Sequence, residues 1–128
     1  MKAEFDGRPV IVAMHHPPFA SSVMNGEPDQ EILQNDYVPL FEKYGVKLVL
    51  NGHTHMYERS FKDGVHYIIA GPAGGSRAIP LGVNRYKVFS RFLSMTFSTV
   101  KINGQNIEIK TWDEQNILID QLAIPLNN

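Results

Sequence analysis

The sequence predicts an α/β fold in which a strand–helix–strand unit is followed by an antiparallel meander of strands. Two short apolar runs rich in β-branched residues, 8–14 and 46–50, flank a helical pattern at residues 30–44. Further along the chain, apolar residues alternate with polar ones, and the dipeptide Asn103-Gly104 is a strong signal for a hairpin turn between two such stretches.

The strand–helix–strand unit begins with an almost wholly apolar run at residues 8–14, typical of a strand covered on both faces. Residues 17–29, rich in proline, serine, asparagine and glycine, are expected to form a loop long enough to be the rim of a site. The helix at residues 30–44 has Pro39 as a point where it would break or kink, and Gly45 is a stop signal.

The second apolar run, residues 46–50, is expected to pair in parallel with the first, because a strand–helix–strand connection returns through a right-handed crossover. Later strands are expected at residues 65–70, 92–102, 107–112 and 117–124, with an irregular glycine-rich stretch at 71–86. There is no internal repeat and no clear linker, so we expect one domain.

Four of the five histidines lie in two short segments, each directly after one of the two apolar runs. His15 and His16 precede a Pro-Pro pair, and His53 and His55 are separated by one residue and preceded by Gly52. Parallel strands would carry His15 and His53 to one edge of the sheet, where α/β sheets form their binding crevices. Imidazole is the commonest protein ligand for transition metals, so a metal site is favoured over two loops with solvated surface histidines.

His53 and His55 could not both reach one ion from a regular strand, because the side chains of an extended strand do not converge on one point. Gly52 permits a turn, in which His53 and His55 either converge on one ion or each bind one ion of a close pair. Ions in two-metal hydrolytic sites lie roughly 3.5–4 Å apart, a gap that this segment can span.

The segments Met14–Phe19 (MHHPPF) and Asn51–His55 (NGHTH) resemble the C-terminal half of the calcineurin-like metallophosphoesterases. The continuation at residues 56–60 (MYERS) is similar to the purple acid phosphatase branch, in which Tyr-Glu-Arg follows Gly-His-x-His. The resemblance implies that residues 1–128 are a single partial domain, the C-terminal half of a metallophosphoesterase β-sandwich flanked by helices. It also implies a metal-dependent phosphoester hydrolase, either a phosphatase or a phosphodiesterase.

By the same resemblance, the site would hold two divalent or trivalent metal ions, zinc, manganese or iron. His15 and His53 would bind one ion and His55 the other, with His15 chosen over His16 by the family's His-x-Pro spacing, although the doubled histidine permits either register. His16 would then be the catalytic group that contacts the phosphate or protonates the leaving group.

Residues around these motifs supply supporting candidates. Glu58 and Arg59 are expected to pair and brace the turn that bears His55, as outer contacts that orient metal ligands do. Arg77, at the end of the glycine-rich segment 71–77, is a candidate substrate contact.

The family's N-terminal motifs Asp-x-His, Gly-Asp-x-x-Asp and Gly-Asn-His-Glu do not occur in this sequence. We therefore expect a fragment without the N-terminal metal ligands, able to hold at most one ion by itself and inactive alone. The alternative is a non-catalytic fragment or self-associating module with at most one bound ion. For the chain as a whole, the expected partners are a phosphoester substrate and either a second copy of the chain or the missing N-terminal half.

Composition excludes several other classes of function. A net charge of −1 predicts no nucleic-acid surface, and the lack of cysteine excludes disulfides and thiolate ligands. No apolar run approaches the roughly 20 residues of a membrane span, so we expect no membrane association. The sequence leaves localisation open.

Overall fold

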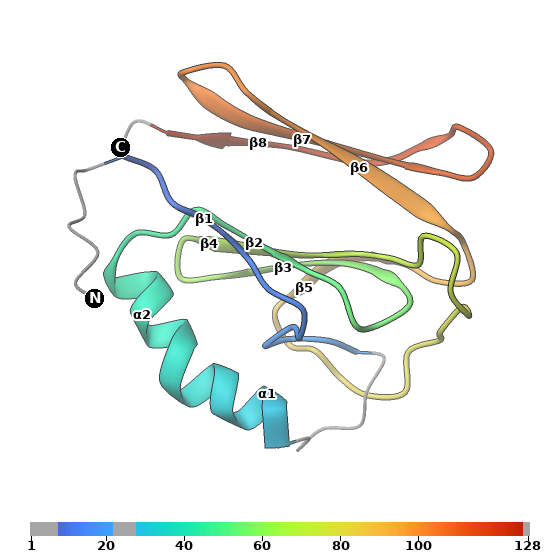
Figure 1. The fold of residues 1–128 in the computed structure, drawn as a ribbon, viewed down its shortest axis with the longest axis horizontal. Helices are drawn as coiled ribbons and strands as arrows, with labels where there is room; N and C mark the ends of the chain where they lie inside the picture. The colour runs from blue at the N-terminus through green and yellow to red at the C-terminus, as the bar shows by residue number, and fades with distance from the viewer. Residues whose placement is uncertain (1–7, 22–27, 127–128) are drawn as a thin grey trace.

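The computed structural model describes residues 8–21 and 28–126 and shows two stacked β-sheets with a helical segment on the outer face of the larger sheet (Figure 1). The elements are β1 (Ile11–Ala13), α1 (Pro28–Ile32), η1 (Leu33–Tyr37), α2 (Val38–Lys43), β2 (Leu48–Asn51), β3 (Tyr57–Lys62), β4 (Val65–Ala70), β5 (Lys87–Arg91), β6 (Thr96–Ile102), β7 (Asn106–Asp113) and β8 (Leu118–Pro125).

The larger sheet has the strand order β1-β2-β4-β3-β5, and the smaller sheet has the order β6-β7-β8. β1, β2 and β4 are parallel, with Ile11 opposite Leu48, whereas β3 and β5 add to the sheet in antiparallel fashion. The smaller sheet is an antiparallel meander turning at residues 103–105 and 114–117. The expected fold class, a strand–helix–strand unit followed by a meander, is confirmed.

The helical segment is interrupted at the place where Pro39 was expected to disturb it. α1 and α2 are joined by η1, a π-helical turn directly before α2, and Pro39 lies in the first turn of α2. Proline has no N–H to donate to the preceding turn, and a widened turn accommodates this loss without ending the helix. No helix among the described residues combines the length and the apolar character needed to cross a bilayer.

β2 is covered on both faces because its alternate residues enter two different cores. Val49 packs with Val38 and Phe41 between the larger sheet and α2, whereas Leu48 packs with Ile107 between the two sheets. All four residues of β2 but Leu50 are buried, as predicted for a central parallel strand.

A largely buried polar contact joins the two sheets. Asp120 of β8 accepts hydrogen bonds from Arg59 Nε (2.7 Å) and Nη2 (3.0 Å) and from the Tyr57 hydroxyl (2.8 Å), both residues of β3. Burial raises the pKa of Tyr57, and the hydrogen bond that Arg59 donates to Asp120 raises the pKa of Arg59. The Arg59–Asp120 pair thus fixes β8 over β3.

One strand was not expected from the sequence, and another begins later than expected. β5 was not predicted, because its residues at the sheet edge are exposed or half-buried and carry no alternating apolar pattern. The strand expected at residues 92–102 begins at Thr96, since Leu93 has a left-handed backbone (φ 59°) that ends extended structure.

His66 of β4 gives the fold a pH dependence. Burial, and secondly the charge of Arg59, lower the pKa of His66 from 6.5 to about 4. Between these values the unfolded chain binds more protons than the folded one, so stability should fall as the pH is lowered from about 6.5 to about 4. Urea unfolding across this range should show a shallower fall for His66→Gln; an unchanged pH profile in that variant would contradict the assignment.

Candidate metal centre

The two histidine-bearing loops are joined by hydrogen bonds that continue past the ends of β1 and β2. Met14 N donates to Leu50 O and Gly52 N donates to His15 O, both at 3.0 Å. The buried Asn51 side chain donates through Nδ2 to the carbonyls of Met14 (3.3 Å) and His16 (3.1 Å). The Asn51 amide therefore holds the His15–His16 backbone against the end of β2.

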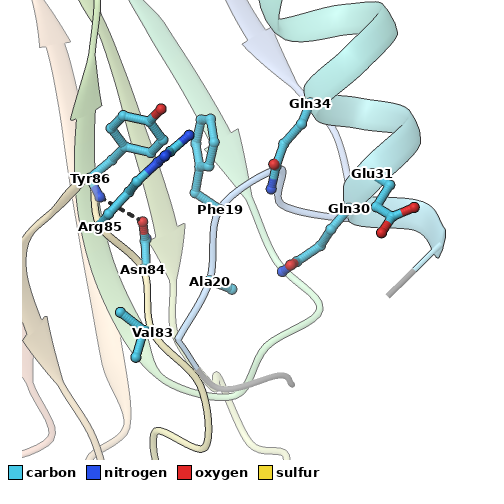
Figure 2. Close-up of a pocket in the computed structure, with 9 residues that line it drawn as sticks. All are labelled: Phe19, Ala20, Gln30, Glu31, Gln34, Val83, Asn84, Arg85 and Tyr86. Carbon is cyan, nitrogen blue, oxygen red and sulfur yellow. Dashed lines mark hydrogen bonds between the residues drawn. The ribbon is translucent and has the colours of Figure 1, made fainter. Parts of the chain in front are cut away.

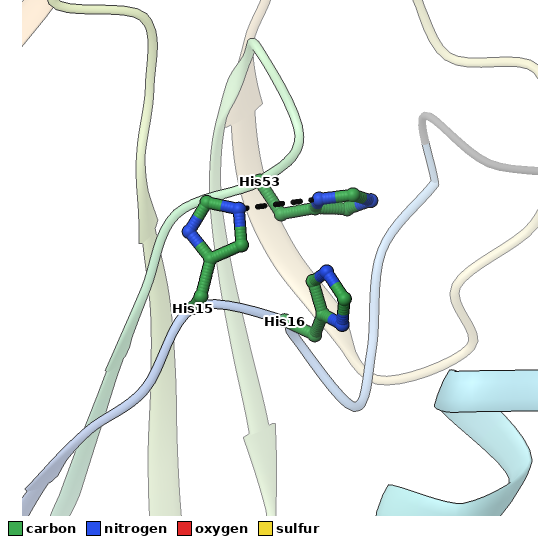
Figure 3. A group of neighbouring side chains, drawn as sticks. All are labelled: His15, His16 and His53. Atoms are coloured by element: carbon green, nitrogen blue, oxygen red, sulfur yellow. Dashed lines mark hydrogen bonds between the residues drawn. The ribbon is translucent and has the colours of Figure 1, made fainter.

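The chain turns sharply after β2 at His53. His53 has φ 64°, a left-handed conformation uncommon outside glycine, although histidine adopts it more readily than most residues. Thr54 N donates to Gly52 O at 2.7 Å, which closes the turn around His53. This conformation directs the His53 ring back toward His15, as Figure 3 shows.

His15, His16 and His53 form a compact cluster on the sheet edge (Figure 3), each with a ring nitrogen within 4.8 Å of those of the other two. His53 Nδ1 lies 3.4 Å from His15 Nε2, and the His16 and His53 ring centroids are 4.2 Å apart. Three neutral imidazoles form the donor set of mononuclear zinc sites that keep an open coordination position. The donor chemistry thus fits a first-row transition metal.

Asp29 is a site residue that the sequence analysis missed. Its Oδ2 lies 3.0 Å from His16 Nδ1, which leaves Nε2 of His16 to face the cluster. A carboxylate on the second ring nitrogen is the usual way to orient a metal-ligating histidine. No short motif links residues 16 and 29; only the start of α1 near the histidine loop brings them together.

A cavity of about 370 Å³ opens beside the cluster and gives it access to a small ligand. It is bounded by the histidine loop on one side and by the helical segment on the other, with lining residues Met14, His15, His16, Asp29, Ile32, Leu33 and Tyr37.

His55 lies outside the three-histidine cluster, on the side of the loop at residues 71–86. Its Nδ1 is 2.9 Å from Ser76 Oγ, and its backbone carbonyl accepts from Ala78 N at 2.8 Å. A Cβ on Gly75 would lie 2.9 Å from His55 Cε1, so only glycine there permits this ring position. The assignment of His55 to a second ion stays a prediction, as do those of His15 and His53 to the first.

The ion pair expected between Glu58 and Arg59 is wrong, because neighbouring strand residues point to opposite faces. Arg59 pairs with Asp120, whereas buried Glu58 accepts hydrogen bonds from Ser21 N (3.1 Å), the Ser21 hydroxyl and Asn84 Nδ2 (2.6 Å). Glu58 therefore braces the far end of the histidine loop instead of the turn at His55.

Arg77 directs its guanidinium to Glu114, with Nη2 3.3 Å from Oε1, in a partly exposed ion pair. Its neighbour Ser76 contacts His55, which places this loop next to the turn that bears His53 and His55. The role of Arg77 as a substrate contact stays a prediction.

Residues 2–57 match the model of the calcineurin-like phosphoesterase family. The chain is 40% identical over 52 residues to purple acid phosphatase 15 of Arabidopsis thaliana and 40% identical over 63 residues to a 3',5'-cyclic-nucleotide phosphodiesterase of Nostoc sp.. These alignments cover 41% and 47% of the chain but only 10% and 23% of the two relatives. The chain thus spans a small part of the curated relatives it matches.

Two solved structures show the same fold. A structure described as GAP50, the anchor in the inner membrane complex of Plasmodium, superposes with a TM-score of 0.82 over 97% of this chain and 39% of its own, at 17% identity. Vps29 of Chaetomium thermophilum superposes with a TM-score of 0.53 over 92% of this chain and 57% of its own, at 11% identity. The comparisons thus give a match to the calcineurin-like phosphoesterase family over residues 2–57 and a fold shared with these two solved structures.

Proposed function

We propose that this chain supplies part of the metal centre of a metal-dependent phosphoester hydrolase. The observation that carries the proposal is the convergence of three imidazoles from two loops, with ring nitrogens within 4.8 Å of one another. The family match over residues 2–57 supports it, as do the names of two partial relatives, a phosphatase and a phosphodiesterase. The Tyr57-Glu58-Arg59 triplet favours the purple acid phosphatase branch.

Within this proposal, His15 and His53 hold an ion, and Asn51 keeps their two loops in register. A bound ion would lower the pKa of a water ligand and polarise a phosphoryl oxygen. His16, oriented by Asp29, either completes the ligand set or contacts the phosphate and its leaving group. His55 binds a second ion, and Arg77 contacts the substrate.

A second ion needs ligands from outside residues 1–128, because the sequence contains none of the family's carboxylate-bearing N-terminal motifs. We therefore propose that residues 1–128 are part of a single metallophosphoesterase domain. The remaining ligands of a dinuclear zinc, manganese or iron centre would come from a segment beyond them.

A non-catalytic module with one bound ion is the alternative. It is favoured by the composition of the cluster, which among the described residues consists of imidazoles alone. The nearby carboxylate of Asp29 is engaged with His16 Nδ1 and does not bridge two ligand sets.

Metal analysis combined with an assay of phosphodiester hydrolysis separates the two proposals. The full chain, dialysed against zinc or manganese, should retain one equivalent that His15→Ala loses and His66→Ala, a histidine outside the cluster, keeps. Because the remaining ligands are proposed to lie outside residues 1–128, turnover of bis(p-nitrophenyl) phosphate is measured with the segment that supplies them present. Turnover that disappears in His15→Ala would then support the hydrolase. One equivalent without turnover would support the module, and no retained metal would contradict both.

A further inference from the structure

A second cavity, of about 380 Å³, lies between the helical segment and the chain that leads into β5 (Figure 2). We call it the Gln30 cavity; its lining residues are Phe19, Ala20, Gln30, Glu31, Gln34, Val83, Asn84, Arg85 and Tyr86. None of them is a histidine, so the cavity is separate from the metal cluster. It lies at the β5 side of the larger sheet, whereas β1 forms the opposite edge.

One polar side chain of the cavity is buried without a partner. Gln30 is only 9% exposed, and its amide nitrogen has no hydrogen-bond partner. Figure 2 shows this side chain extending from α1 toward the space between the helix and residues 83–86. By contrast, Gln34 Nε2 donates to Pro18 O at 2.7 Å, and Asn84 Nδ2 donates to Glu58 and Ser60. An unsatisfied buried amide calls for an explanation, and the hydrogen-bonding edge of a bound ligand would satisfy it.

The opposite wall is aromatic and cationic. The Phe19 and Tyr86 rings are 4.8 Å apart between centroids, and the guanidinium carbon of Arg85 lies 4.9 Å from the Tyr86 ring centroid. In the part of the chain that the structure describes, neither Arg85 nor Glu31 forms an ion pair. A planar guanidinium that lies over one ring can offer its other face to a flat ligand.

These features select a class of ligand. Binding cavities range from about 300 to 1,000 Å³, so this one suits a small molecule such as a nucleoside and not a dinucleotide. A glutamine amide both donates and accepts, and it recognises the edge of a base that does the same. Guanidinium and aromatic faces stack on bases.

We propose that the Gln30 cavity binds a planar nitrogen heterocycle of the nucleobase class. The edge of the heterocycle meets the Gln30 amide, and its face lies against Arg85. The proposal does not depend on the metal centre, because none of these groups belongs to the histidine cluster.

The test uses the full, ¹⁵N-labelled chain in EDTA, so that no metal or phosphate chemistry contributes. Adenosine, guanosine, cytidine and uridine are titrated separately while NMR follows the side-chain amide of Gln30 and Nε of Arg85. At least one nucleoside should bind saturably and shift both signals. Gln30→Met and Arg85→Lys should each weaken that binding about tenfold, because a site built for a hydrogen bond or a planar stack discriminates strongly when the group is lost.

Matched substitutions elsewhere serve as controls. Gln121→Met and Arg91→Lys change the same residue types outside the cavity and should leave the affinity unchanged. Gln30→Met should not lower the thermal midpoint of the ligand-free chain, since the amide nitrogen has no partner to lose. No saturable binding by any of the four nucleosides, or binding that persists equally in both cavity variants, would overturn the proposal.

Discussion

Replacing Arg59 by methionine should lower the free energy of unfolding by about 3 kcal/mol, because removal of one member of a buried ion pair leaves the other charge uncompensated. The Arg59 and Asp120 side chains are 14% and 10% exposed, which places the effect at the lower end of the usual range for such pairs. The change also removes a link between β3 and β8, and so between the two sheets. Urea unfolding followed by circular dichroism measures it.

The matched control for this change is Arg77→Met. Arg77 pairs with Glu114 in a contact that is 43% and 29% exposed, so its loss should cost only about 0–1 kcal/mol. Adding Asp120→Leu to Arg59→Met should recover part of the lost stability, since an apolar pair avoids the buried charge. Equal losses in the free energy of unfolding for Arg59→Met and Arg77→Met would contradict the larger contribution assigned to the Arg59–Asp120 pair.

Replacing His53 by alanine should weaken zinc binding by more than about 100-fold. The change leaves two imidazoles from adjacent residues of one loop, and even a change in a residue that only orients a ligand costs about 10- to 100-fold. Competition with a chromophoric chelator gives the affinity.

Replacing Asp29 by asparagine should weaken zinc binding by about 10- to 100-fold, because it weakens the hydrogen bond on His16 Nδ1 without removing a ligand. The same chelator competition measures this loss of affinity.

His55→Ala is the control for the His53 variant. His55 lies outside the cluster and contacts Ser76, so its removal should leave the affinity for the first ion within a few-fold of the original. A loss as large as that of His53→Ala would place His55 in the same ligand set and would contradict the observed arrangement.

The meeting of the two histidine segments could be predicted from sequence, because it depends on local topology alone. Two apolar runs joined by a helical pattern imply parallel strands, and parallel strands present their carboxyl ends at one edge. β1 and β2 pair in this way, and the residues that follow them, His15 and His53, are neighbours. The meander was predictable for a similar reason, because Asn103-Gly104 and the alternation around it encode its register locally.

The partners of individual polar groups could not be predicted, because they depend on how separate elements pack. Asp29 reaches His16 only through the docking of α1 on the histidine loop, and Glu58 reaches Ser21 across 37 residues of sequence. Adjacency of Glu58 and Arg59 in the sequence suggested an ion pair, but the pleat of β3 sends the two side chains to different partners.

The Asn51 amide, which spans the carbonyls of Met14 and His16, couples the affinity for an ion to the stability of this end of the sheet. Because these hydrogen bonds fix the backbone that carries the three rings, little entropy is left to lose on chelation. An ion that prefers the folded edge then raises the melting temperature in proportion to the logarithm of its concentration. Denaturation should release metal in the same transition that separates the two strands.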